Sequence, residues 1–290
     1  MPTLFQLVLH LAANYSEADY AILSTLLARH AAHGWEENDA PDGGLRLTVH
    51  FTVPDACAEC EQVLANALPG LAITRNEVEQ SDWLEAWKEF FTPVEAGRHF
   101  LVIAPWMEKE RATTARMPIT IEPKTAFGTG HHASTALCLT ALSHMADKGC
   151  IKKGMRFLDL GTGSGILAIG AALLGLCGQA LDIDPIAVDN ALENREVNGI
   201  SPADMQVGRG DLSAAKGPFS LVIANILAGP LIDMAPEMAA LCNDAGEKPL
   251  LVLSGILITQ ADAVAEAYVK QGFPQPHRLE REEWAALVFA

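Results

Sequence analysis

The first 80 residues alternate between apolar runs and polar turns in the order strand, helix, strand, strand, helix, strand. The first helix is predicted to open at the capping residue Ser16. Its apolar residues recur at helical spacing, at Ile22, Leu23, Leu26 and Leu27. One of the three strands after this helix has no clear pattern, whereas "LRLTVHFTV" alternates clearly. This order predicts a split βαβ, ferredoxin-like α+β domain over residues 1–80.

A short segment at residues 81–98, "SDWLEAWKEFFTPVEAGR", separates this domain from the rest. Trp83 and Trp87 are four positions apart, as on one face of a helix. We expect a helical linker that packs both indoles against a domain.

From residue 99 the pattern changes to alternating strands and helices up to residue 290. We expect one helix to close at Asn198-Gly199 and another to be started or kinked by Pro236. Such alternation predicts a doubly wound α/β sheet that helices cover on both faces. The predicted strands are "MRFLDL", "GQALDID", "DMQVG", "FSLVIAN", "PLLVLSGI" and "EWAALVFA".

Composition and charge narrow the class of protein. Half of the 290 residues are hydrophobic, and no apolar run reaches the ~18 residues of a membrane span. The N-terminus has no basic start before its apolar stretch, so we expect a cytoplasmic protein without membrane attachment. The formal net charge of −16 argues against nonspecific nucleic-acid binding and favours basic partners. Residues 1–80 hold eleven acidic residues against three arginines, a net charge of −8.

The six cysteines do not predict a metal site. Only Cys57 and Cys60 have the spacing of metal ligands, and no second pair or matching histidines accompany them. We expect ordinary reduced thiols and no bound metal.

The strongest chemical signal is "FLDLGTGSGILAIG", in which a strand ends near Asp159 and glycines follow at 161, 163 and 165. Glycines before a helix let backbone amides approach a ligand closely. The dinucleotide pattern needs a small residue at position 166, where Ile166 stands, and the Gly-Lys-Ser/Thr of a P-loop is absent. The pattern D-x-G-x-G-x-G looks like that of nucleoside-binding methyltransferases.

Polar residues at the ends of the next strands support a nucleoside site. Asp182 follows Gly161 by 21 positions, near the ~20 expected for a carboxylate that binds both ribose hydroxyls. Its neighbour Ile183 belongs to the same expected site, and Asp184 is predicted to cap a helix that starts at Pro185.

Asp211 and Asn225 end two further strand regions. Asp211 can reach an adenine amine, although Gly-Asp is also a common turn. Asn225 ends an apolar strand at the edge where open α/β sheets bind ligands. Its side-chain carbonyl can accept a hydrogen bond from a substrate amine and so aim the nitrogen at a methyl group. The alternative is an asparagine that only caps a loop.

Taken together, five motifs closely resemble the bacterial ribosomal protein L11 methyltransferase family: "AFGTGHHASTALCL", "LDLGTGSGILAI", "LDIDPIAVDNALENREVNG", "VIANILAGPL" and "LVLSGILITQADAV". The likeness spans roughly residues 80 to 290. It implies a Rossmann-like class I fold and an enzyme that uses S-adenosylmethionine to methylate lysine side chains and the N-terminal α-amine of a basic ribosomal protein. It also implies that the N-terminal domain recognises this protein substrate.

The resemblance also implies which residues contact the cofactor: Phe127, Gly128, Thr129, Gly130, Thr135, Asp159, Gly161, Asp182 and Asn225, the last also positioning the substrate amine. We expect Gly163, Ile183 and Asp211 to belong to the same cofactor site. The chain departs from the family at Lys124, where a glycine usually follows the acidic residue and proline. This change bears on the conformation of the segment that follows.

The adjacent His131 and His132 leave three interpretations open. Neighbouring residues on an extended chain point apart, which disfavours a shared metal. A loop histidine can serve as a general base. The third interpretation is a role in shaping the loop and the start of the next helix, near Ala133.

Other functions remain as alternatives to a protein-amine methyltransferase. The same fold can methylate another protein or a small molecule, because a fold does not settle the substrate. A noncatalytic, cofactor-binding module associated with the ribosome has no need of a substrate-aiming amide at Asn225. A nicotinamide oxidoreductase is disfavoured by Ile166.

Overall fold

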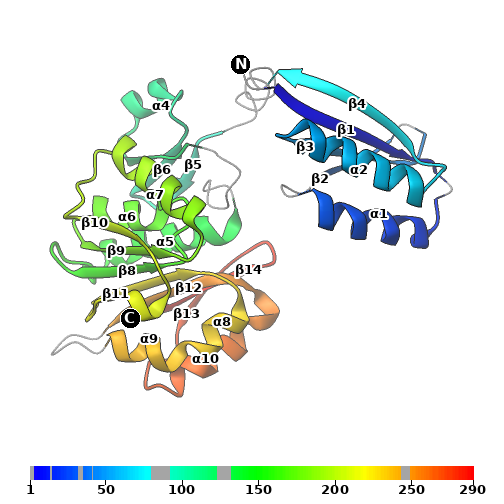
Figure 1. Ribbon diagram of the computed structural model, residues 1–290. Coiled ribbons are helices and arrows are strands. Elements are labelled where there is room, and N and C mark those ends of the chain that lie inside the picture. Colours follow the sequence, from blue (N-terminus) through cyan, green and yellow to red (C-terminus); the bar gives the residue numbers. More distant parts are fainter. Residues whose placement is uncertain are drawn as a thin grey trace. The chain divides into compact units, whose positions relative to one another are not determined.

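The computed structural model describes residues 3–13, 15–31, 35–40, 42–79, 92–122, 132–242 and 249–290. These residues divide into two compact units, one within Met1–Phe91 and one within Thr92–Ala290 (Figure 1). Within the described residues, no helix is both long enough and apolar enough to cross a bilayer.

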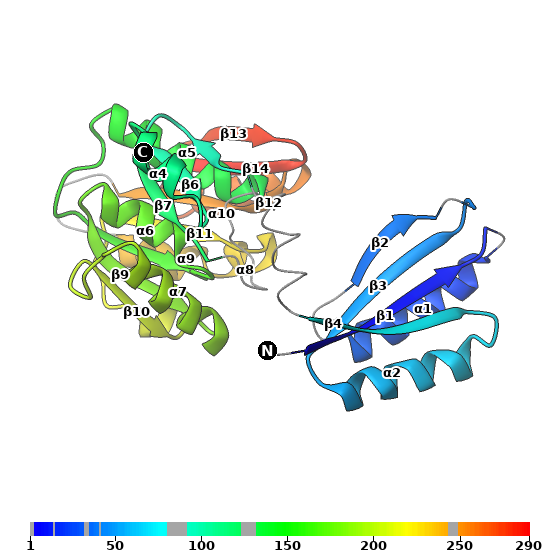
Figure 2. The same ribbon diagram turned by 90° about the horizontal axis from the view of Figure 1, so that it is seen from above.

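The first unit is a four-stranded antiparallel sheet with two helices on one face (Figure 2). Its strand order, β2-β3-β1-β4, is that of the split βαβ arrangement. Ser16 is the N-cap of the first helix, as predicted, and it forms a capping box in which the Ser16 hydroxyl accepts from the Asp19 backbone N–H and the Asp19 carboxylate accepts from the Ser16 backbone N–H. The elements are β1 (Thr3–Leu11), α1 (Glu17–His30), β2 (Trp35–Asp39), β3 (Leu45–Phe51), α2 (Pro54–Ala67) and β4 (Ala72–Glu79).

Alternation along the strands sets which side chains face the helices. Leu7, Leu9 and Leu11 of β1 are buried in one cluster with Leu23 and Leu64 of the two helices. The intervening residues of β1 lie on the other face of the sheet, since side chains alternate along a strand. The unit therefore has one apolar face and one polar face.

The second unit contains a seven-stranded sheet in the order β10-β9-β8-β11-β12-β14-β13. Every neighbouring pair up to β12 is parallel, and β14 runs antiparallel to both of its neighbours. Figure 1 shows α5, α6 and α7 on one face of this sheet and α8, α9 and α10 on the other. The predicted doubly wound sheet is confirmed.

The bounds of these elements agree with the predicted segments in most places. The strands are β8 (Arg156–Leu160), β9 (Cys177–Asp182), β10 (Met205–Arg209), β11 (Leu221–Asn225), β12 (Leu250–Leu257), β13 (His277–Arg281) and β14 (Trp284–Phe289). The helices are α5 (Ala133–Asp147), α6 (Ile166–Leu173), α7 (Pro185–Val197), η1 (Leu212–Ala214), α8 (Ala228–Asp233), α9 (Ala235–Cys242), η2 (Ile258–Gln260) and α10 (Ala261–Val269).

The helix ends that were predicted from capping residues, glycine and proline agree with the structure. Asp184 caps α7 by accepting from the Ile186 backbone N–H at 2.9 Å, with Pro185 in the first turn. The same helix ends before Gly199, which has a φ of +68°. Pro236 lies in the first turn of α9 and so starts a helix, as one of the two predicted alternatives.

A small second sheet precedes the main one. It has the order β5-β6-β7 and consists of β5 (Val94–Ala96), β6 (Phe100–Ile103) and β7 (Met117–Thr120), with α4 (Glu108–Thr113) between its last two strands. Phe100 and Ile119 pack in one cluster with α5 and α6. Residues 94–96, the end of the segment predicted as a helical linker, are thus a strand of the second unit, whereas Trp83 and Trp87 lie outside the described residues.

A bulge interrupts the pairing of β12 with β14. The register shifts between Leu253 and Ile256, and Gly255 there has a φ of +78°. A Cβ at Gly255 would come within 2.6 Å of the Ile226 carbonyl oxygen, just after β11. Only glycine fits, because both the backbone angle and the space exclude a side chain.

The cysteines of the chain are reduced thiols. All six cysteines are free, and burial raises the pKa of the Cys138 thiol to about 12.

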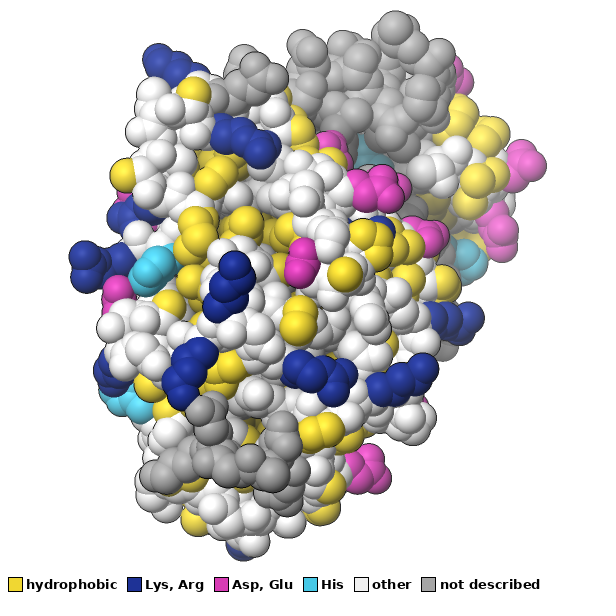
Figure 3. Space-filling model, turned by 90° about the vertical axis from the view of Figure 1, so that its left-hand side faces the viewer, with side chains coloured by type: hydrophobic (Ala, Val, Ile, Leu, Met, Phe, Trp, Pro, Cys, Tyr) yellow, Lys and Arg dark blue, Asp and Glu magenta, His cyan; other side chains and the backbone are white. Residues whose placement is uncertain are grey.

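Figure 3 shows one face of the molecule, on which lysine and arginine side chains are spread between uncharged and hydrophobic ones. On that face no single charge type forms a continuous cover.

Candidate functional site

The glycine loop between β8 and α6 is built from left-handed glycines. Gly161, Gly163 and Gly165 have φ values of +71°, +56° and +82°. A Cβ on Gly161 would lie 2.6 Å from Cγ2 of Ile226, and one on Gly165 would lie 3.1 Å from Cε of Met205. The glycines therefore serve both the sharp turn and the close packing of the loop between neighbouring strands.

Asp159 anchors this loop from inside the core. Its side chain is fully buried, and Oδ2 accepts hydrogen bonds from the Thr162 hydroxyl at 2.7 Å and the Ala168 backbone N–H at 3.1 Å. Oδ1 is buried and has no hydrogen-bond partner among the described residues. Burial raises the pKa of Asp159 to about 7, although the two hydrogen bonds oppose the rise.

Asp182 ties the loop to the end of β9. Oδ2 accepts from the Gly163 backbone N–H at 2.9 Å, and Oδ1 accepts from the Asp184 backbone N–H at 3.0 Å. Because a carboxylate oxygen can accept more than one hydrogen bond, each oxygen keeps capacity for a ligand hydroxyl. Ile183, the next residue, is 69% exposed and offers an apolar surface beside this carboxylate.

Asp211 follows β10 at the same edge of the sheet. Its Oδ1 accepts from the Ser213 hydroxyl at 2.6 Å and the Ser213 backbone N–H at 3.0 Å, which caps η1. These bonds lower the pKa of this exposed carboxyl group. The turn interpretation of Gly-Asp is therefore realised here, and the adenine contact stays a prediction.

Asn225 stands at the carboxyl end of β11, beside the glycine loop. Leu160 pairs with Ala224, so the two strands end side by side. The Asn225 Nδ2 donates to Oγ1 of Thr135 at 3.2 Å, and Thr135 lies buried in the first turn of α5. This bond orients the amide and turns its carbonyl oxygen away from the hydroxyl. Two residues predicted separately for the site are thus joined.

His132 forms the N-cap of α5. Its Nδ1 lies 2.7 Å from the Ser134 hydroxyl and accepts from the Ser134 backbone N–H at 3.3 Å. The imidazole also packs edge-on against the ring of Trp284, with centroids 4.5 Å apart. Of the three interpretations left open, shaping the start of the helix matches these contacts.

Part of the expected site cannot be placed. The predicted residues Phe127, Gly128, Thr129 and Gly130 lie outside the described residues, as do Lys124 and His131. The described part of the expected site comprises Thr135, Asp159, Gly161, Gly163, Asp182, Ile183, Asp211 and Asn225.

Two further residues hold the site in place through hydrogen bonds, and the sequence did not predict either of them. Thr162 donates its hydroxyl to Asp159, and the buried side chain of Asn194 reaches the Ser164 carbonyl of the glycine loop at 2.9 Å. A threonine between motif glycines is a weak signal for the first. Nothing in the linear sequence distinguishes Asn194 from a solvated helix residue.

The described residues fit a nucleoside ligand that carries a cationic amine. A buried carboxylate oxygen without a partner suits an amine donor, and the Asp182 carboxylate suits two neighbouring hydroxyls. The exposed Ile183 suits one face of a base. Sheet topology concentrates these groups, because parallel strands all end at one edge.

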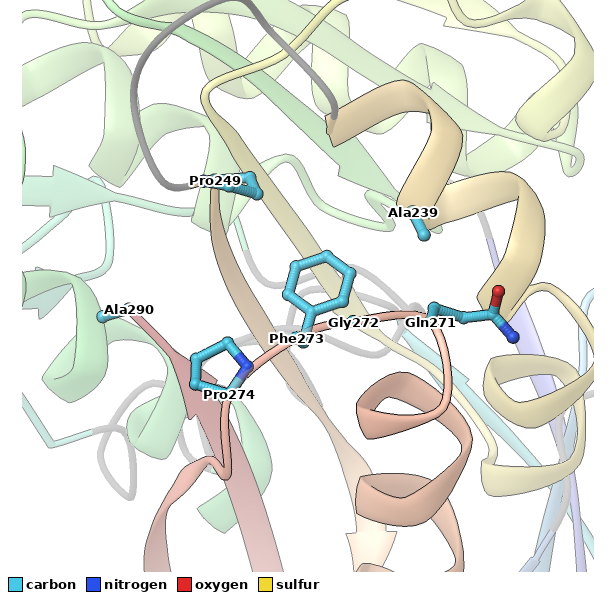
Figure 4. A pocket seen from close by; sticks show the side chains of 7 residues that line it. All are labelled: Ala239, Pro249, Gln271, Gly272, Phe273, Pro274 and Ala290. Atoms are coloured by element: carbon cyan, nitrogen blue, oxygen red, sulfur yellow. The ribbon is translucent and has the colours of Figure 1, made fainter.

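A separate cavity lies at the other end of the parallel strands, away from the candidate site. It has a volume of about 320 Å³ and is bounded by Pro249 before β12, Ala290 after β14, and Phe273, whose position Figure 4 shows. Leu221 pairs with Leu250, so this is the edge where β11 begins rather than where Asn225 ends it. The cavity has no part in the candidate site.

Comparison with known proteins places these features in a family. A family model described as ribosomal protein L11 methyltransferase (PrmA) matches residues 13–290. A ribosomal protein L11 methyltransferase of Symbiobacterium thermophilum is 33% identical over 285 residues, covering 93% of this chain and 90% of that protein. One of Myxococcus xanthus is 37% identical over 251 residues, covering 85% and 82%.

A solved structure is also similar. The crystal structure of a ribosomal protein L11 methylase from Lactobacillus delbrueckii subsp. bulgaricus aligns with a TM-score of 0.60 and 28% identity. It covers 69% of this chain and 98% of that one.

Proposed function

Because the chain belongs to the ribosomal protein L11 methyltransferase family, we propose that it transfers methyl groups from S-adenosylmethionine to amines of ribosomal protein L11. The amines are lysine side chains and the N-terminal α-amine. The observation that carries the proposal is the oriented amide of Asn225 beside the glycine loop.

The residues of the loop and of β9 would hold the cofactor. Asp182 would receive the ribose hydroxyls, Ile183 would contact the base, and the free Oδ1 of Asp159 would accept from the amino group. When bound, S-adenosylmethionine supplies a methyl group that its sulfonium already activates.

Asn225 would then place the acceptor nitrogen. Its Nδ2 is engaged by Thr135, so Oδ1 is the atom that accepts a hydrogen bond from the incoming amine. Held in this way, the nitrogen would present its lone pair to the methyl group that the cofactor supplies, and a reactive conformer requires the two atoms to be ~3–3.5 Å apart. No side chain needs to form a covalent bond.

The amine must be neutral before it reacts. A free lysine has a pKa near ~10.4, and desolvation in the site lowers this value because it disfavours the charged form. We assign the released proton to solvent, since the Nδ1 of His132 is engaged in capping α5.

The N-terminal unit would recognise the protein substrate. Its acidic excess suits a basic partner, and Glu36, Asn38 and Asp39 are exposed on β2, one of the two edge strands of that sheet. Reversing charge at Glu36 and Asp39 in the full chain should raise KM for L11 and leave cofactor binding unchanged. Glu59→Lys, on an exposed position of α2, is the matched control.

The proposed activity is tested with labelled S-adenosylmethionine and ribosomal proteins from cells that lack this methylation. Label should appear on L11, at lysines and the N-terminus when its peptides are mapped. Label on another protein would support the alternative substrate, and label only on side chains that are not amines would contradict amine transfer. An absence of transfer despite cofactor binding would favour the noncatalytic module.

A further inference from the structure

Asn194 of α7 and Asn198 at its C-cap form hydrogen bonds with the backbone at the end of β7, as a neighbouring strand would. Asn198 Oδ1 accepts from the Thr120 backbone N–H at 2.8 Å, and its Nδ2 donates to the Thr120 carbonyl at 2.7 Å. Asn194 Oδ1 accepts from the Glu122 backbone N–H at 2.9 Å.

The spacing explains why one helix face can do this. Asn194 and Asn198 are one helical turn apart, about 6 Å, and Thr120 and Glu122 are two strand residues apart, about 6.6 Å. The helix therefore presents two amides in step with alternate backbone groups of the strand. These groups face away from β6, which pairs with the other side of β7.

Asn194 has a second contact that Asn198 lacks. Its Nδ2 donates to the Ser164 carbonyl at 2.9 Å, in the middle of the glycine loop, and lies 3.3 Å from Oδ1 of Asn190. The Asn194 side chain is fully buried. One amide thus bonds the glycine loop on one side and residue 122 on the other.

We propose that Asn194 is a positioning residue, which fixes the glycine loop and the chain at Glu122 at one separation and thereby sets the affinity for the cofactor. The inference rests on the proposed function in so far as both segments bind one ligand. Glu122 lies five positions before Phe127, the first of the residues at 127–130 to which cofactor contacts are assigned. A shift of the loop relative to Glu122 would separate the two sets of contacts.

Two matched variants test this role. Asn194→Asp keeps the acceptor for Glu122 but loses the donor to Ser164 and faces that carbonyl with an oxygen. Asn198→Asp makes the same chemical change one turn later, at the C-cap of α7. It removes the donor to the carbonyls of Thr120 and Asn194 without touching the glycine loop. Both are examined below their melting temperatures.

The first measurement is the Kd for S-adenosylhomocysteine by calorimetry. We expect Asn194→Asp to weaken binding about tenfold or more, the effect of one lost buried hydrogen bond with an unpaired carbonyl. Asn198→Asp should weaken it by no more than about twofold. Equal losses in both variants, or full affinity in Asn194→Asp, would overturn the inference.

The second measurement needs no ligand. Hydrogen exchange should quicken at the amides of Gly163 and Gly165 in Asn194→Asp, and only near Thr120 in Asn198→Asp. If the unchanged protein binds no S-adenosylhomocysteine, the proposed function is wrong. The positioning role of Asn194 is then tested by hydrogen exchange alone. Unchanged exchange in the glycine loop of Asn194→Asp would then refute the positioning role.

Discussion

The side-chain amide of Asn225 lies 3.2 Å from the hydroxyl of Thr135, a residue 90 positions earlier in the chain. The end of one strand and the start of one helix are thereby fixed to each other at the candidate site. The amide is held in one orientation before any substrate arrives. Preorganisation of this kind is what positioning catalysis requires.

Replacing Asn225 by alanine should abolish the placement of the amine. We expect methyl transfer to fall roughly 100-fold at saturating cofactor, since a misplaced nucleophile costs about that much. Because Asn225 is also an expected cofactor contact, the Kd for S-adenosylhomocysteine should rise as well, but by much less than the rate of transfer falls, as calorimetry can check. Full transfer by Asn225→Ala would remove the residue from the mechanism.

Removing the hydroxyl of Thr135 should have a smaller effect of the same kind. Thr135→Val leaves Asn225 in place but frees its amide to rotate, so we expect a loss in kcat of about fivefold to tenfold, the value of one hydrogen bond. Thr135→Ser, which retains the hydroxyl, is the control. A Val variant as active as the Ser variant would show that the bond is incidental.

Asp182→Asn should weaken cofactor binding by about 10- to 100-fold, because it removes charge-assisted hydrogen bonds worth about 1.5–3 kcal/mol. It also places an amide group near the Gly163 or Asp184 backbone N–H. Asp184→Asn, whose side chain can still cap α7, is the control. Comparable losses in the two variants would point to a general disturbance of this edge.

The raised pKa of Asp159 predicts a pH dependence of stability. The group titrates near ~3.9 in the unfolded chain and near about 7 in the fold. Between these values the folded state holds a proton that the unfolded state does not. Its contribution to stability is therefore complete below about pH 4 and is lost as pH rises towards about 7, at ~1.4 kcal/mol per pH unit.

Melting curves of Asp159→Asn and of the unchanged protein from pH 5 to 8 check this dependence. The stability of the variant relative to the unchanged protein should rise with pH up to about 7 and then level off. Asp211→Asn should show no such trend, because a carboxyl group with a lowered pKa stays ionised over this range. Parallel curves for Asp159→Asn would contradict the prediction.

Gly255→Ala should destabilise the protein by about 2–5 kcal/mol, from the left-handed backbone and from the contact with Ile226. Gly199→Ala is the matched control, since Gly199 has a φ of +68° but open space around its Cβ position. It should cost only about 1–2 kcal/mol by denaturant unfolding. Equal losses of unfolding free energy in the two variants would mean that Ile226 moves aside without resistance.

Much of the fold followed from local patterns in the sequence. The inner strands β11 and β12 are nearly continuous apolar runs, and the glycines of the loop lie between a strand and a helix, so their places could be predicted. By contrast, β13 was missed because it is an edge strand whose residues, "HRLER", are mostly polar and largely exposed. An edge strand of this kind leaves little hydrophobic signal.

The site was predictable only as far as topology dictates it. Asp159, Asp182 and Asn225 end strands, and parallel strands end at one edge, so their proximity could be expected. The Thr135–Asn225 bond depends on how α5 packs on β11, which no local pattern encodes. The bonds of Asn194 were hidden for another reason, since a buried, fully bonded asparagine looks in sequence like a solvated one.

The bulge at Gly255 also limits how the protein can be recombined. The backbone after Asn225 fits against a strand that contributes no predicted ligand contact, and the two segments are complementary in shape. A chimera that takes β11 from one parent and β12 from another would bring together surfaces that never evolved against each other. Crossover points are therefore better placed before Leu221 or after Leu257, so that both strands are inherited as one block.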